Sequence, residues 1–178
     1  MVRVLSPQDG LDQFSDVIWA YGQGPADSTG ASVSTGANTA FLTRFRVARP
    51  FLVSAIQPFC NAVGAGGNVI TGIFTSADQS TFVPVATSGV VAAASLTWAN
   101  CTMSYRLVPG TDYWTAMACD SIAPTWARGS LSPSTHGLQQ ALLIQKASAY
   151  SGSGFVANLS SMAASTFLPT LKILGTTS

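Results

Sequence analysis

Short stretches of alternating apolar and polar residues, each closed by a turn signal, run through most of this chain. The clearest spans residues 41–47, where Phe41, Phe45 and Val47 alternate with arginines at 44 and 46. Such alternation is typical of a half-buried β-strand, because successive side chains point to opposite faces of a sheet. About eight or nine short strands follow one another, with turn signals about every 8 to 12 residues. The pattern predicts an all-β fold, either a single antiparallel β-sandwich or a barrel.

Two of the expected strands need separate comment. Pro58 interrupts the second strand, so it should mark an edge, a bulge or a break. Residues 90–97 are rich in alanine, which favours a helix, but their β-branched residues and neighbouring strands favour a strand, which we expect. Pro109 and Gly110 predict a tight turn, followed by a buried strand in which Trp114 is largely buried. The expected strands are 41–47, 52–63, 69–75, 81–86, 90–97, 101–108, 113–119 and 167–174, and residues 138–147 suit a strand or a short helix.

The first 36 residues differ in composition from the rest of the chain. Pro, Gly, Asp and Ser dominate residues 22–36. We therefore expect an N-terminal arm or extended segment over 1–36 and a β-sandwich domain over 37–178. The apolar cluster of Phe14, Val17, Ile18 and Trp19 is expected to dock against a neighbouring subunit or a particle shell. The alternative is that this segment adds a strand to its own sandwich.

The chain carries little charge for its size. Of its 178 residues 47% are hydrophobic and only 8% are charged, where soluble domains average about 25%. A surface built from Ser, Thr, Gly, Asn, Gln and Ala gives little repulsion between copies, so we expect a homo-oligomer, such as a cyclic trimer or a lattice. The net charge of +1 gives no electrostatic reason to expect nucleic acid or an anionic membrane as a partner. The longest apolar run is also shorter than the roughly 20 residues that span a bilayer.

Catalytic residues are poorly represented. His136 is the only histidine and lies in a loop rich in hydroxyl groups, where a Ser-His-Asp triad would have to recruit a residue such as Asp120. The sequence has no Gly-x-Ser-x-Gly nucleophile motif, and its few aspartates do not indicate a paired-carboxylate site. We expect no enzymatic activity and no cofactor, with a hydrolase on the same scaffold as the weakest alternative.

Metal ligands are equally sparse. Asp9, Asp12 and Asp16 lie close together in sequence but lack the loop pattern that fixes calcium ligands, so a solvated turn or cap is expected. Three cysteines, at positions 60, 101 and 119, match no zinc spacing and are expected to be buried, reduced thiols.

A few side chains are candidates for contact with partners. Arg44 and Arg46 point the same way on a strand and could bind an acidic partner surface, or simply form a polar outer face. Aromatic side chains could stack on sugar rings. Tyr113 and Trp114 are expected in the core, so Trp126, in a loop beside Pro124, is the best candidate for an exposed ligand contact; Trp98 is the remaining aromatic of this group.

Three stretches together resemble a known family. They are Phe-Leu-Thr-Arg-Phe-Arg-Val at 41–47, Val-Ile-Thr-Gly-Ile-Phe-Thr at 69–75 and Leu-Val-Pro-Gly-Thr-Asp-Tyr-Trp at 107–114. They are similar to a module common in bacteriophage fibres and head-surface proteins, in which a Gly-Ile-Tyr/Phe strand and a later turn followed by Tyr-Trp close the core. The resemblance covers about residues 41–119 and extends to the last strand at 167–174.

The resemblance implies a jelly-roll-type, carbohydrate-binding-like β-sandwich located in the virion. It implies a structural protein, either a head decoration, a head fibre or a small tail component, whose partners are further copies of itself and other virion proteins. The alternative that it leaves open is a receptor-recognition module that binds a host surface glycan.

Overall fold

The computed structural model of the protein describes residues 17–19, 32–127, 143–164 and 169–177, and within these ranges all regular secondary structure is β-strand. The strands are β1 (Val17–Trp19), β2 (Ser32–Ser34), β3 (Ala40–Phe45), β4 (Phe51–Ala62), β5 (Asn68–Thr75), β6 (Val83–Thr87), β7 (Val91–Ala92), β8 (Thr97–Trp98), β9 (Cys101–Leu107), β10 (Tyr113–Cys119), β11 (Thr125–Ala127), β12 (Leu143–Lys146), β13 (Ala163–Ala164) and β14 (Leu171–Thr177).

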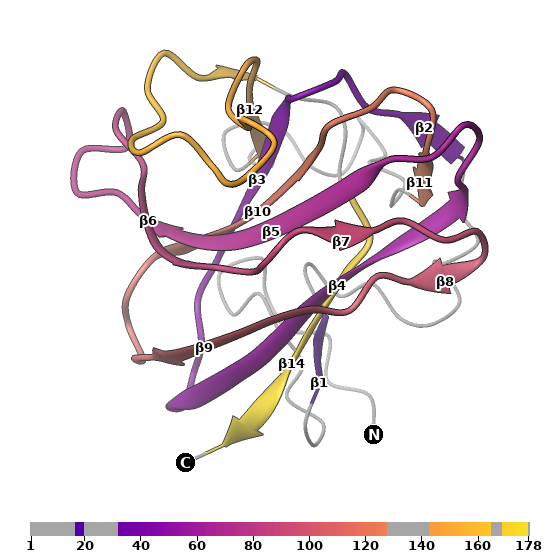
Figure 1. Cartoon of the computed structure of the whole chain (residues 1–178). Helices are drawn as coiled ribbons and strands as arrows, with labels where there is room; N and C mark the ends of the chain where they lie inside the picture. The colour runs from indigo at the N-terminus through magenta and orange to yellow at the C-terminus, as the bar shows by residue number, and fades with distance from the viewer. Residues whose placement is uncertain (1–16, 20–31, 128–142, 165–168, 178) are drawn as a thin grey trace, which may run out of the picture.

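The strands form two antiparallel sheets that pack face to face, so the fold is a β-sandwich, as the strand pattern predicted (Figure 1). The first sheet has the order β1-β14-β4-β11-β2, with β8 and β9 also paired to β4. The second sheet has the order β13-β12-β3-β10-β5-β6, with β7 paired to β5. In Figure 1 the layer that contains β5 and β10 lies above the layer that contains β4, β9 and β14.

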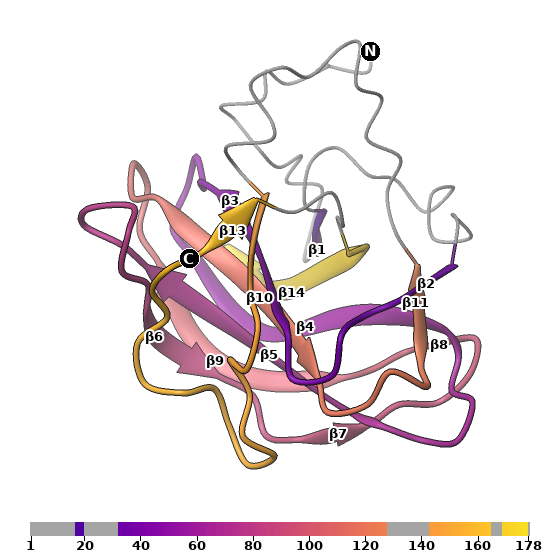
Figure 2. The same cartoon turned by 90° about the horizontal axis from the view of Figure 1, so that it is seen from above.

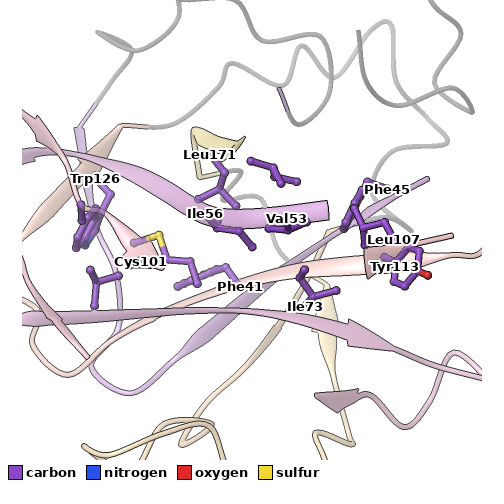
Figure 3. Close-up of a cluster of buried hydrophobic side chains, with 14 of the residues drawn as sticks. Phe41, Phe45, Val53, Ile56, Ile73, Cys101, Leu107, Tyr113, Trp126 and Leu171 are labelled. Carbon is purple, nitrogen blue, oxygen red and sulfur yellow. The ribbon is translucent and has the colours of Figure 1, made fainter. Parts of the chain in front are cut away.

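The main hydrophobic core lies between the two sheets. Val53 and Ile56 of β4 face Phe41 of β3 and Ile73 of β5 across this interface (Figure 3). Met117 of β10 belongs to the same cluster and is fully buried. This is the apolar face that period-two alternation requires.

The second sheet is buried on its outer face as well. Leu42 and Trp114 lie in a separate apolar cluster with Phe82 and Leu159, under the segment 147–162 that follows β12 (Figure 1). Phe82 and Leu159 exchange two backbone hydrogen bonds, of 2.8 and 2.9 Å, which attach this segment to the sheet. Every residue of β10 is consequently buried, as expected for the strand after the Pro109 turn. The expected polar face of residues 41–47 is corrected, because Leu42 is covered there rather than solvated.

Pro58 does not break its strand, because β4 runs without interruption from Phe51 to Ala62. The proline lies where the partner strands change. On one side the pairing with β9 ends at Ile56 and that with β8 begins at Phe59. The Ala99 carbonyl, in the gap between β8 and β9, accepts a hydrogen bond from Cys101 instead, at 3.1 Å. The missing N–H of the proline therefore leaves no ladder bond unmade.

Residues 90–97 do not form the single strand that their composition predicted. They contain the two-residue strand β7 and the first residue of the two-residue strand β8, joined by a turn in which Leu96 adopts a φ of 55°. The closing strand is β14, which begins at Leu171 and pairs with most of β4. Of residues 138–147, the described part forms the strand β12.

Two short strands from the first 36 residues belong to the first sheet. β1 pairs with β14, with Val17 opposite Leu174 and Trp19 opposite Lys172. β2 pairs with β11. The backbone at 17–19 and 32–34 is thus part of the sandwich, while residues 1–16 and 20–31 lie outside the described residues. Figure 2 shows β2 and β11 together at one end of the molecule.

Candidate functional site

Arg44 and Arg46 point the same way, as predicted, and both bind Asp112 of their own chain. The Arg44 Nη2 and Arg46 Nε atoms donate to its two carboxylate oxygens, and Arg46 Nη2 adds a third hydrogen bond at 3.0 Å. The hydrogen bond from Arg46, supported by Arg44, lowers the pKa of Asp112 below its usual value, against the opposing effect of burial. The Arg44 guanidinium also lies 5.7 Å from the centre of the Trp114 ring.

This ion-pair cluster lies at one end of the sandwich, and among the described residues it leaves that end with an excess of positive charge. Two arginines share one carboxylate there, and Arg49 and Arg106 are exposed beside the start of β4. A single carboxylate, that of Asp112, does not balance the charge of these arginines. The surface of this end therefore complements an acidic surface on a partner. The structure places the two predicted arginines together but gives them a partner within the chain.

Trp126 is not a surface contact, and that expectation is corrected. Its side chain is 0% exposed and belongs to the core between the sheets (Figure 3). The loop ends at Pro124, and β11 begins at the next residue and pairs with β4 opposite Cys60. This pairing turns the indole inward, where a sugar cannot reach it. Three residues are too few for a strand to be recognised by periodicity.

The predicted arm contacts fall partly in β1. Val17, Ile18 and Trp19 form this strand, and their backbone pairs with β14. That arrangement corresponds to the alternative in which the segment adds a strand to its own sandwich. Phe14 lies outside the described residues. Docking of this segment against another subunit stays a prediction.

The opposite end of the sandwich displays apolar side chains on two loops. Leu96 is 76% exposed and Ile122 is 65% exposed, the largest values among the exposed apolar side chains that the structure describes. Both loops pack on the β4–β5 turn. Ser95 accepts a hydrogen bond from the Val63 N–H at 2.9 Å, and the loop of Ile122 lies so close that a Cβ at Gly64 would be 2.9 Å from the Ala123 carbonyl oxygen. We call Leu96 and Ile122 the apolar loop pair.

A third surface combines aromatic, amide and amino groups on the outer face of the first sheet. The Trp98 ring packs against Phe59 in an edge-on arrangement, with centroids 5.1 Å apart, and Lys172 Nζ lies 3.6 Å from the Trp98 ring centre. Gln57 Nε2 donates to Asn100 Oδ1 at 3.0 Å. Burial lowers the pKa of Lys172. We define these five residues as the Trp98 patch; none of them is buried.

Sequence reasoning missed most of the Trp98 patch. Trp98 was one of four aromatics named as possible sugar contacts, and the structure buries the other three, Tyr113, Trp114 and Trp126. The one available signal was that Trp98 lies two residues before the polar Asn100 and outside a long alternating strand. The contributions of Gln57, Phe59 and Lys172 depend on strand pairing that no local pattern encodes.

The remaining chemical groups form no reactive site among the described residues. Cys60, Cys101 and Cys119 are buried free thiols, as expected, and burial raises the pKa of each. The described ranges hold no group of three or more His, Cys, Asp or Glu that could bind a metal ion. They also contain no helix long and apolar enough to cross a membrane. His136 and the aspartates at 9, 12 and 16 lie outside these ranges.

Comparison with protein families, with curated proteins and with solved structures finds no match for this chain. Its function must therefore be inferred from its own residues and their arrangement.

Proposed function

We propose that the protein is a non-enzymatic structural component of a bacteriophage virion, which acts by assembling with copies of itself and with other virion proteins. A head decoration, a head fibre and a small tail component are the roles that fit. The resemblance of residues 41–119 to phage surface modules, the β-sandwich fold and the low charge support this proposal.

The observation that carries the assembly role is the apolar loop pair. Single exposed apolar side chains are ordinary on protein surfaces. Leu96, however, is held at a φ of 55°, a left-handed conformation that costs a bulky L-residue roughly 1–2 kcal/mol. A side chain kept in that conformation, and presented to solvent on a loop that packs on the same turn as the loop of Ile122, is suited to a contact surface.

The physical basis of the assembly is the burial of apolar surface with little electrostatic repulsion between copies. Apolar surface removed from water contributes about 25 cal/mol per Å². A chain with 8% charged residues provides few like charges to oppose the approach of two copies. The positive end around Arg46 gives a second surface, of different chemistry, for an acidic partner in the particle.

Light scattering of the purified full chain tests self-assembly. At about 50 µM, where weak assemblies of micromolar affinity are populated, we expect a species larger than the monomer. The double variant Leu96→Asn and Ile122→Ser should be shifted toward monomer, because Asn tolerates the left-handed conformation while the apolar contact is lost. Val108→Ser, at the opposite end, is the matched control. A monomeric wild type, or an unchanged double variant, would contradict the assembly role.

The virion location needs a separate experiment. Particles of a phage that encodes the chain should contain it as a fixed number of copies per particle, measured by quantitative mass spectrometry of purified particles. Absence from the particles would reject the location while leaving self-assembly open.

A further inference from the structure

Strand β9 forms a free edge of the first sheet. Its seven residues pair with β4 on one side, and none of the other described strands pairs with its second side. β6, the edge strand of the second sheet, contains Pro84, whose missing N–H makes it a poor template for a further strand. β9 has no proline and only one charged residue, Arg106. Its backbone is therefore suited to pairing with another strand.

The side chains of β9 also suit such a pairing, because they alternate along the whole strand. Thr102, Ser104 and Arg106 are exposed, whereas Met103 and Tyr105 pack against the core between the sheets and are only half-buried. The alternation continues without a break where the pairing with β4 shifts register. A strand added at this edge covers the apolar surface of Met103 and Tyr105 that β4 and the second sheet leave exposed.

The strand is complementary to itself in one antiparallel register. Residues directly opposite each other in an antiparallel pair point to the same face of the sheet. When Ser104 lies opposite its own copy on a two-fold axis, all seven residues of the strand are paired. Met103 then lies opposite Tyr105 of the second copy, which gives a thioether–aromatic contact, and Thr102 lies opposite Arg106. A register centred on Arg106 would instead place two like charges opposite each other.

We propose that two copies of the protein pair through β9, antiparallel about a two-fold axis at Ser104, so that their first sheets become one continuous sheet. The occupant is a second copy because this register matches every side chain of the strand with one from the same strand. The low charge of the chain also gives little repulsion between copies. The inference rests on the proposed self-assembly and names a second contact, separate from the apolar loop pair.

Disulfide trapping in the full chain tests the register. In Ser104→Cys the two Cα atoms at the two-fold axis are about 4.5–5.5 Å apart, within the range of a disulfide, and oxidised glutathione accepts the two electrons and two protons of the thiols. Thr102→Cys, an exposed position on the same strand, is the matched control, because its two copies lie about 13 Å apart. The covalent dimer on non-reducing gels should be at least about 10-fold more abundant for Ser104→Cys. Wild type controls for the three native thiols, which are buried.

Charge substitutions at position 102 test the pairing without a covalent bond. Thr102→Arg should weaken dimerisation by about 5-fold and Thr102→Asp should strengthen it by about 5-fold, because each residue lies opposite Arg106 of the other copy. Sedimentation measures both in the double variant Leu96→Asn and Ile122→Ser, which removes the loop contact. Thr87→Arg, at an exposed position on β6, is the matched control and should leave dimerisation unchanged.

The outcomes separate this contact from the proposed function. Equal or absent trapping in the two cysteine variants, or equal affinities for Thr102→Arg and Thr102→Asp, overturns the pairing through β9. If the wild type then still assembles, and the double loop variant does not, self-assembly stands and only the β9 contact is rejected. A monomeric wild type whose Ser104→Cys variant also forms no covalent dimer rejects both.

Discussion

Trp114 anchors the cluster on the outer face of the second sheet. Its side chain is 3% exposed, and its ring lies edge-on to Phe82, with centroids 5.1 Å apart. Trp114→Ala should lower the free energy of unfolding by roughly 3–5 kcal/mol, through lost burial and the cavity left behind. Urea denaturation gives this value. Val108→Ala, at a position that is 53% exposed, should stay within about 0.5 kcal/mol of wild type. A Trp114→Ala variant as stable as the control would refute the packing described for β10.

Asp112 gives the protein a pH-dependent contribution to stability. Hydrogen bonds from Arg46 and Arg44 lower its pKa in the folded state, whereas the unfolded chain titrates near about 3.9. The contribution is therefore present above about pH 4 and is lost as the pH falls through the lower folded pKa.

The comparison with Asp112→Asn isolates this contribution. Asp78 also has a lowered pKa, chiefly because Ser80 donates a hydrogen bond to it. The loss of stability of the wild type at acid pH would therefore combine the effects of two carboxylates. Wild type should melt higher than Asp112→Asn near pH 7, and the difference should shrink below about pH 4 as the carboxylate is protonated. A difference that does not vary with pH would exclude an ionic role for Asp112.

At the scale of elements, the two N-terminal strands cover the edges of the first sheet. β1 pairs with β14, and β2 pairs with β11, a three-residue strand that carries the buried Trp126. Deleting residues 1–19 should lower the melting temperature, and deleting residues 1–36 should lower it further, because β11 then becomes an unprotected edge. Thermal unfolding of the two truncated chains measures both steps.

The same truncations decide between the two roles of the N-terminal segment. If the chain without residues 1–36 melts like wild type but no longer assembles, the segment is an anchor rather than part of the sandwich. A lower melting temperature assigns β1 and β2 to the stability of their own domain.

For the whole molecule, the two ends predict different responses to salt. Assembly through the apolar loop pair should persist as the salt concentration rises from about 0.1 M to 1 M, over which the screening length falls from about 10 to 3 Å. Attachment of the arginine end to an acidic surface should weaken over the same range. Light scattering at both salt concentrations measures this response, with Arg46→Gln as the charge variant and Leu96→Asn as the apolar one. If self-assembly is instead lost at high salt, the contact between copies is made by the arginine end and not by the apolar loop pair.

Local patterns were sufficient for much of the fold. Alternation at 41–47 and 101–108 predicted β3 and β9, because side-chain direction along a strand depends only on neighbouring residues. Pro109 and Gly110 predicted the turn before β10, and Gly110 has the φ of 80° that a type II turn requires.

Tertiary structure decided which strands and side chains are neighbours in space. Pro58 is tolerated inside β4 because β8 and β9 leave a gap beside it, and Trp126 is buried because β4 and β2 flank its short strand. Gly175 is needed where β14 shifts register, since a Cβ there would overlap the Leu52 backbone.

The sequence by itself determined the all-β class, most strand positions, the buried Trp114 and the low surface charge, since each depends on composition or on residues a few positions apart. Only the tertiary structure decided that Trp126 is enclosed, that Asp112 neutralises part of the arginine pair, and that Phe59, Trp98 and Lys172 share one surface. The physical reason is that strand pairing joins segments many residues apart. The cost of closing those loops is offset by the whole core, so no local pattern specifies a single pairing.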